Sequence, residues 1–218
     1  MAEIANEVGS SKIGDPYAKW TSGKQTEALY AVESWYSWHS RDDYTNNIKS
    51  IANAYYGKLN GSETNMAEAS MAKALEGTAI DRTVRKQIAD AQAAIQNITQ
   101  PFRNHIGSTE AQQAMEACAA LQASLSEVTN DEDEVEAGAA AVNLRDAVNK
   151  LDEATLQAII NNYVDNVVVP TYKNLKDQNA ILYQTVNAFV ANPSNDGFEA
   201  CATAWMNARQ PWETSEAF

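Results

Sequence analysis

The chain has 218 residues, of which 44% are hydrophobic and 21% charged, and its formal net charge is −13. This length and apolar content suffice for one domain with a substantial core, and no run of 18 apolar residues is present that would span a membrane. The acidic excess argues against a nucleic acid partner, because phosphate binding needs clustered Lys and Arg. It favours solubility, with attraction of cations as the alternative.

The residue pattern predicts helices along almost the whole chain. Only five prolines are present, and no sustained stretch alternates apolar and polar residues as a strand would. A loop is expected at 14–17, followed by a helix over 24–38. Ser40 fits the N-cap of the next helix, whose first turn carries Asp42 and Asp43, where negative charge is favoured by the helix dipole. Gly57 fits its C-terminal cap.

Further helices are predicted over 65–75, 81–98 and 108–128. The apolar pattern then continues from 153 to 190 as one long helix, which is expected to kink at Pro170 because proline removes a backbone hydrogen bond. A turn at 192–197 leads into a last helix over 196–208. The core positions predicted on the long helix are Leu156, Ile160, Tyr163 and Leu182.

One segment is predicted to be a linker. Residues 130–136 form the only strong charge run, and the alanine-rich stretch that follows offers no large side chain to pack. We therefore expect two segments, 1–128 and 142–218, joined by an acidic and alanine-rich linker at 129–141. Together they are expected to form one helical domain.

The last residues of the chain hold the first candidate site. Arg209, Glu213 and Glu216 follow one another at spacings of four and three, so a helical turn would place them on one face beside Trp212. Two carboxylates in this arrangement coordinate a cation or hold the arginine in a polar network. The alternative is a set of exposed charges near a fraying end. Pro211 fits only if a new helix begins near it.

A second candidate cluster lies around the turn between two predicted helices. A histidine with nearby carboxylates binds a metal, titrates near neutral pH or caps a helix, and we favour a structural hydrogen-bond network over a metal site. A catalytic triad of Ser37, His39 and Asp42 is disfavoured, since residues so close in sequence rarely converge on one point. The cluster comprises Glu33, Ser37, His39, Arg41, Asp42, Asp43, Tyr44 and Asn47.

Several of these blocks resemble segments of the imelysin family, in reversed order. Residues 209–218, Arg-Gln-Pro-Trp-Glu-Thr-Ser-Glu-Ala-Phe, are similar to the family's ARxPWExSEAF segment, and residues 163–172 also resemble its N-terminal portion. The block at 33–48, followed by Tyr-Tyr-Gly at 55–57, is similar to the family's C-terminal portion. The resemblance extends to shorter stretches at 4–9, 12–17 and 100–105.

The resemblance implies an all-α, up-and-down helical bundle that is a circularly permuted imelysin-like domain. In this interpretation residues 1–128 correspond to the family's C-terminal portion and residues 142–218 to its N-terminal portion. The family's middle, which carries a GxHxxE motif, is missing. The chain has two histidines, His39 and His105, and neither is followed by Glu three places later.

The family is linked to exported, iron-regulated uptake, as periplasmic or cell-surface lipoproteins, although this N-terminus has no signal peptide pattern. We expect a non-catalytic binding or scaffold domain. The alternatives are a metal-binding or metallopeptidase-like protein, and an engineered permutant without a selected function. No cofactor is assigned with certainty. Iron or another divalent metal is expected to bind weakly, a protein partner stays open, and the sequence does not determine the oligomeric state.

The two candidate clusters are expected to be neighbours in the fold. A salt bridge or hydrogen bond between Arg209 or Glu216 and the segment 33–47 is the specific contact predicted. The binding residues carried over from the family's blocks are Glu33, Ser37, His39, Arg41, Asp42, Asp43, Asn47, Arg209, Trp212, Glu213 and Glu216.

Overall fold

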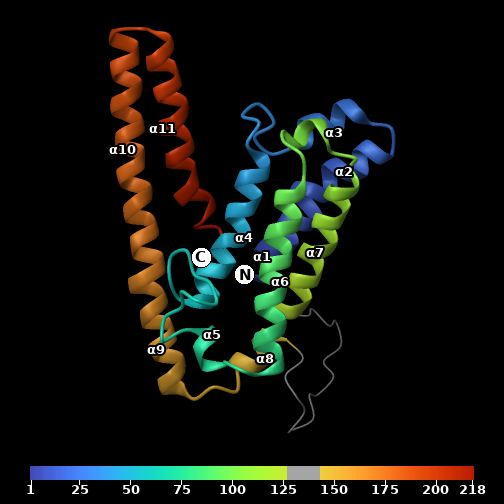
Figure 1. Ribbon diagram of the computed structural model, residues 1–218, viewed down its shortest axis with the longest axis vertical. Coiled ribbons are helices and arrows are strands. Elements are labelled where there is room, and N and C mark those ends of the chain that lie inside the picture. Colours follow the sequence, from blue (N-terminus) through green and yellow to red (C-terminus); the bar gives the residue numbers. More distant parts are fainter. Residues whose placement is uncertain (127–142) are drawn as a thin grey trace.

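The computed structural model describes residues 1–126 and 143–218, so the linker expected at 129–141 lies outside the described residues. Within these ranges the chain is helical, and the only β interaction is one isolated antiparallel bridge between Ser62 and Asn65. The all-α prediction is confirmed. Figure 1 shows a bundle built around α4, α6 and α7, beside a long hairpin of α10 and α11. Among the helices described, none combines the length and apolar composition needed to cross a membrane.

The N-terminal region is a continuous helical run rather than a helix that ends in a loop. The short helix α1 (Ala2–Asn6) passes through the π-helical segment η1 (Glu7–Ile13) into α2 (Gly14–Thr21). The loop predicted at 14–17 is therefore wrong. Pro16 closely follows the π-helical segment η1, and this irregular stretch accommodates the backbone hydrogen bond that proline removes. Gly9 lets this run approach α7, since a Cβ there would lie 2.8 Å from Cβ of Cys118.

The helix predicted over 24–38 is only half formed. The helix α3 (Gln25–Ala31) ends early, and the following residues form turns in which Ser34 and Trp38 have positive φ angles. Arg103, from the short 3-10 helix η2 (Phe102–Asn104), stabilises these turns. It donates a hydrogen bond to the backbone oxygen of Trp35 at 3.0 Å, and its guanidinium lies over the rings of Trp35 and Trp38. A tertiary contact thus overrides the helical pattern.

The central helix α4 (Ser40–Tyr56) matches its predicted bounds closely. Its N-cap is His39 rather than Ser40, because the Ser40 hydroxyl donates instead to the backbone oxygen of Glu33 at 2.7 Å. Gly57 ends the helix in the left-handed conformation, as predicted. Almost the whole length of α4 is buried, and this places it at the centre of the bundle.

The helices α6 and α7 complete the bundle and were predicted to within three residues at each end. Thr78 and Ser108 cap them with their hydroxyl oxygens, and their apolar faces pack against α4 and η1. The helix predicted over 65–75 is wrong apart from the four residues of α5. The remaining bounds are α5 (Met71–Ala74), α6 (Ala79–Asn97), η2 (Phe102–Asn104), α7 (Thr109–Leu125) and α8 (Leu144–Val148).

The long helix predicted from residue 153 is confirmed as α9 (Glu153–Tyr163), η3 (Val164–Val168) and α10 (Val169–Ala191). Pro170 lies in the first turn of α10, just after the π-helical segment η3, and the kink expected at this proline stays a prediction. The last helix, α11 (Asn195–Glu213), runs five residues further than predicted and contains Pro211 in its interior. The expectation that a new helix begins near Pro211 is therefore wrong.

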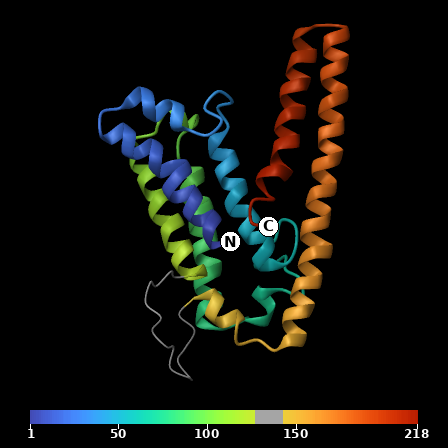
Figure 2. The ribbon, with the colours of Figure 1, turned by 180° about the vertical axis from the view of Figure 1, so that it is seen from behind.

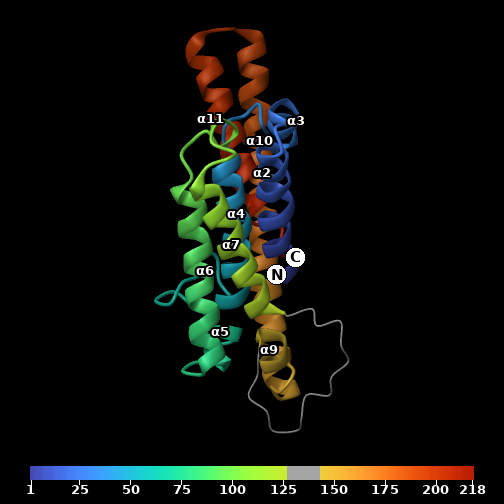
Figure 3. The ribbon, with the colours of Figure 1, turned by 90° about the vertical axis from the view of Figure 1, so that its right-hand side faces the viewer.

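The predicted core positions on the long helix are also wrong. Ile160 is 53% exposed, and Leu156, Tyr163 and Leu182 are only half-buried. Leu182 lies on α10, which packs mainly against α11 and stands apart from the bundle, as Figures 1 and 2 show from opposite sides. The other three positions lie on α9, which packs mainly against the adjoining segment η3. In Figure 3 the tip of the hairpin extends beyond every other described element. The apolar periodicity of α10 is that of a helix, but the bundle does not cover two faces of this hairpin.

Candidate functional site

The C-terminal end of α11 is joined to α4 by Arg209. Its Nε atom donates to Oδ2 of Asp43 at 2.8 Å, and its Nη2 atom lies 3.4 Å from Oε1 of Glu33 and 2.9 Å from Oε1 of Glu213. The guanidinium also lies over the ring of Trp205. The two clusters predicted from sequence are therefore in direct contact, through the kind of salt bridge that was expected.

Asn47 and Lys12 extend the cluster on the side of the bundle. Asn47 Nδ2 donates to Oε2 of Glu213 at 2.7 Å and to its backbone oxygen at 3.2 Å. Lys12, from η1, donates to Oδ1 of Asn47 at 2.9 Å and lies 3.1 Å from Oε2 of Glu33. We call these six residues, Lys12, Glu33, Asp43, Asn47, Arg209 and Glu213, the Arg209 network.

Lys12 was not among the predicted site residues. A lysine in a helical run is normally solvated, and nothing in its own neighbourhood indicates that it is buried. The available signal was its position at the start of the block 12–17, which resembles an imelysin segment.

Burial raises the pKa values of two carboxylates in the network, Glu213 and Asp43. Glu213 is 0% exposed, and this burial, together with the charge of Asp43, raises its pKa to about 7 against the opposing effects of Arg209 and Asn47. Its Oε1 atom accepts no hydrogen bond, because Arg209 is close enough for an ion pair but is not aligned to donate. Burial also raises the pKa of Asp43, although Arg209 opposes the shift.

The pKa values of the two cationic side chains are also raised, and for a cation this favours the charged form. Burial by itself lowers the pKa of Lys12 and of Arg209, but the surrounding carboxylates, chiefly Glu33 for Lys12 and Asp43 for Arg209, outweigh it and raise both pKa values. Both side chains therefore stay charged at neutral pH. The network is a set of mutually compensating charges at the junction of η1, α4 and α11.

Several predicted site residues lie outside this network. Arg41 turns toward the end of α6, where it donates to the backbone oxygens of Gln96 and Ile98. Ser37 bonds within its own turn, and Trp212 is 53% exposed. Glu216 is half-buried, and its charge contributes to the raised pKa of Lys12.

Tyr44 is buried beneath the cluster and packs edge-to-face against Phe102. Its hydroxyl has no hydrogen-bond partner in the described part of the chain. Tyr44 thus belongs to the core below the site.

His39 and Asp42 form the outer edge of the site. They line a pocket of about 210 Å³ together with Trp205, Arg209 and other residues of α4 and α11. Nδ1 of His39 lies 3.4 Å from Oδ2 of Asp42, and Gln100 Nε2 donates to the other oxygen of Asp42 at 2.9 Å. The side chains that line this pocket thus make few hydrogen bonds within the protein.

The side chains at this pocket do not fit a resident iron centre. First-row metals take about four to six donors in fixed geometry, and of the three His and Asp side chains that line the pocket only His39 and Asp42 are not held by Arg209. Within residues 1–126 and 143–218, no group of three or more His, Cys, Asp or Glu side chains is arranged to hold a metal ion.

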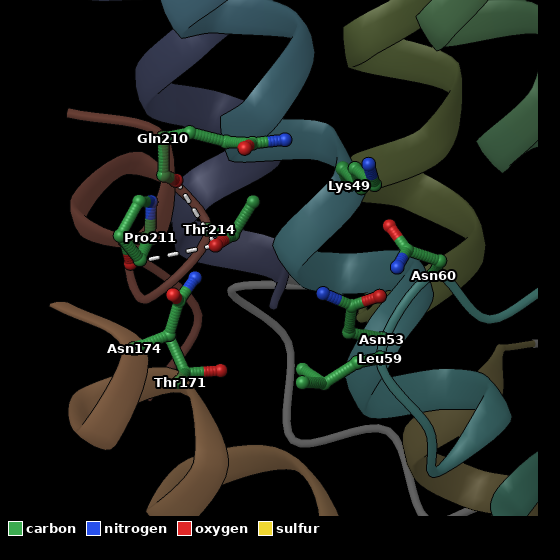
Figure 4. Close-up of a pocket in the computed structure, with 9 residues that line it drawn as sticks. All are labelled: Lys49, Asn53, Leu59, Asn60, Thr171, Asn174, Gln210, Pro211 and Thr214. Atoms are coloured by element: carbon green, nitrogen blue, oxygen red, sulfur yellow. Dashed lines mark hydrogen bonds between the residues drawn. The ribbon is translucent and has the colours of Figure 1, made fainter. Parts of the chain in front are cut away.

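A second pocket of about 110 Å³ lies between α4, α10 and α11 (Figure 4). Its lining is mostly polar, and the amide of the buried Asn53 points toward its interior beside Lys49. Gln210 lines both pockets, so the last turns of α11 separate them. This second pocket is not expected from the sequence, because its walls come from three helices and a loop that lie far apart along the chain.

The fold and the site define an all-α bundle protein in which two sequence blocks, far apart along the chain, are joined by a buried ion-pair network. The Imelysin family model matches residues 1–128 and 168–218. The chain therefore belongs to the imelysin family.

Two solved structures are similar to this chain. An imelysin peptidase from Bacteroides ovatus is 50% identical, with a TM-score of 0.85, over 100% of this chain and 58% of that chain. A putative iron-regulated protein A precursor from Parabacteroides distasonis is 42% identical, with a TM-score of 0.53, over 56% of this chain and 36% of that one. This chain thus spans less than two thirds of the length of either. No curated protein gave a significant match.

Proposed function

We propose that this chain is a non-catalytic binding or scaffold domain of the imelysin family, from an exported protein associated with iron uptake. The observation that carries the proposal is the mutual pairing within the Arg209 network. Arg209 contacts three carboxylates, and Glu213 is fully buried against Asn47 and Arg209. A catalytic base must reach a substrate, whereas these groups hold α11 on α4. The association with export and iron is supported by the similar precursor of an iron-regulated protein.

The binding role is proposed for the pocket lined by His39 and Asp42. It opens beside the network, and it combines an imidazole, carboxylates and the indole of Trp205. Side chains of these types bind small polar or cationic ligands. The Arg209 network would act there as a rigid support, because it fixes the two helices that form the pocket.

A metal-binding or metallopeptidase-like protein is the second candidate. The observation that favours it is the close approach of His39 and Asp42, an imidazole and a carboxylate that both line the pocket. With two donors in place, a metal would complete its coordination with water or with ligand atoms. Such a site would bind weakly.

The test is calorimetry with ferric iron, zinc and calcium at low and moderate salt, combined with peptidase assays. We expect weak association that moderate salt suppresses, and no turnover above background. His39→Ala is the diagnostic variant, and His105→Ala is its matched control because these are the only two histidines in the chain. A stoichiometric, salt-resistant metal site that His39→Ala abolishes and His105→Ala preserves would establish the metal-binding candidate instead. Measurable turnover that is lost with the same variant would establish the peptidase.

A further inference from the structure

The α10–α11 hairpin exposes large apolar side chains along most of its length. Tyr183 is 71% exposed, Val190 69%, Phe198 60% and Trp212 53%. A few isolated apolar residues on a surface are ordinary, but a contiguous set on two adjacent helices marks an interaction surface.

These side chains gather on one side of the hairpin. At about 100° per residue, Tyr183, Val186 and Val190 fall within about 60° of one another around α10. On α11, Phe198, Trp205 and Trp212 recur every seven residues and so share one stripe. Between the stripes runs a groove of about 240 Å³, lined by residues of both helices including Leu182, Trp205 and Trp212. We call these six stripe residues, Tyr183, Val186, Val190, Phe198, Trp205 and Trp212, the hairpin face.

The charge distribution indicates what kind of partner can approach this face. From residue 178 to residue 208 the hairpin carries two charged side chains, Asp196 and Glu199, in a chain whose net charge is −13. Two copies that met through most other surfaces would bring their acidic charge together. Contact through the hairpin avoids this repulsion, because most of the negative charge stays away from the interface.

The size of the face suits a dimer of modest stability. The part of α10 without charged side chains, residues 178–191, is about 21 Å long, and two adjacent helices present a width of about 20 Å. A face of this size buries on the order of 400 Å² on each copy, which is the size of a weak, reversible interface. Two such hairpins that pack face to face form a four-helix bundle, a common way for helical hairpins to bury their apolar sides.

We propose that two copies of this chain associate through the hairpin face to form a two-fold symmetric dimer. The same patch would serve on both copies, so the assembly closes at two subunits. The pocket lined by His39 lies on the α4 side of α11, and the two residues that border both this pocket and the groove are Trp205 and Arg209. The inference is thus independent of whether that pocket binds a ligand.

The experiment is sedimentation equilibrium of the full chain across protein concentrations. We expect a mass of twice 23.8 kDa at concentrations on the order of 10 µM and above, with dissociation on dilution. Moderate salt should preserve or tighten the dimer, because it screens the repulsion between two acidic copies without weakening apolar contact.

The diagnostic variant is Tyr183→Glu, which adds a charge to the centre of the face at a side chain too exposed to affect the fold. It should raise the dissociation constant at least about tenfold, with an unchanged circular dichroism spectrum. Ile181→Glu is the matched control. Ile181 is 48% exposed and lies on the opposite side of α10, so the dimer should persist. A monomer at every concentration, open-ended aggregates, or a dimer that Ile181→Glu disrupts and Tyr183→Glu does not, would each overturn the proposal.

Discussion

Arg209 and Asp43, which are 166 residues apart in the chain, are joined by a hydrogen bond of 2.8 Å between the guanidinium and the carboxylate. This bond attaches the end of the hairpin to the central helix of the bundle. Asp43 is buried and Arg209 is 19% exposed. Water therefore cannot replace either partner, and removal of one leaves the other charge buried without compensation. The junction of the two parts of the fold thus depends on a compensated pair of charges.

Arg209→Met should lower the free energy of unfolding by about 3 kcal/mol, because it leaves Asp43 and Glu213 buried without their cation. Urea denaturation at neutral pH measures the change. Lys86→Met is the control, since Lys86 pairs with Asp90 on the exposed side of α6 and such pairs contribute at most about 1 kcal/mol. Equal effects of the two variants would show that the network does not stabilise the junction.

Glu213 makes stability depend on pH in a defined window. Its pKa is raised to about 7 in the folded protein, so the folded state holds a proton that the unfolded state releases near the ordinary value of 4.5. Its contribution is therefore fully favourable below pH 4.5 and declines as the pH rises to about 7. Glu213→Gln removes this titration.

The measurement for Glu213 is the difference in unfolding free energy between Glu213→Gln and the parent chain from pH 4.5 to 8. We expect the variant to gain stability relative to the parent as the pH rises to about 7, with no further gain above it. Each unit of pKa difference corresponds to about 1.4 kcal/mol. A difference that is constant with pH would contradict the raised pKa.

Gly57 should be far less tolerant of alanine than Gly23, although both have positive φ angles. An added Cβ at Gly57 would lie 2.6 Å from Nδ2 of Asn162, whose amide donates to the backbone oxygen of Gly57. The space around Gly23 is open. Gly23→Ala should cost about 1 kcal/mol for the left-handed backbone alone, and Gly57→Ala at least about 1 kcal/mol more by thermal or chemical denaturation. Equal costs would show that Asn162 moves aside freely.

The core lies in the bundle and not in the hairpin, and two leucine substitutions distinguish these locations. Leu121 is fully buried in α7, so Leu121→Ala should cost about 3 to 5 kcal/mol. Leu182 is half-buried, and Leu182→Ala should cost about 1 kcal/mol when measured in the Tyr183→Glu background, which removes any contribution from association. A large effect of Leu182→Ala in that background would place α10 in the core after all.

Local sequence determines the helices whose caps and apolar stripes agree. Ser108 begins α7 and Gly57 ends α4 as expected, since each cap needs only its own neighbours to form. The failures have non-local causes. The pattern over 24–38 is helical, yet Arg103 holds its second half in turns through the backbone of Trp35. The circular permutation and the linker at 129–141 remain predictions.

The sequence by itself determined that the protein is helical and which two blocks carry its charged motif, because helical periodicity and residue identity are local properties. Only the tertiary structure decided that Lys12 joins Glu33 and Asn47, that Glu213 is buried, and that the apolar stripe of α10 is exposed. Burial depends on what packs against a helix, and no pattern within the helix specifies it. The protonation of Glu213 and the exposed hairpin face both follow from that packing.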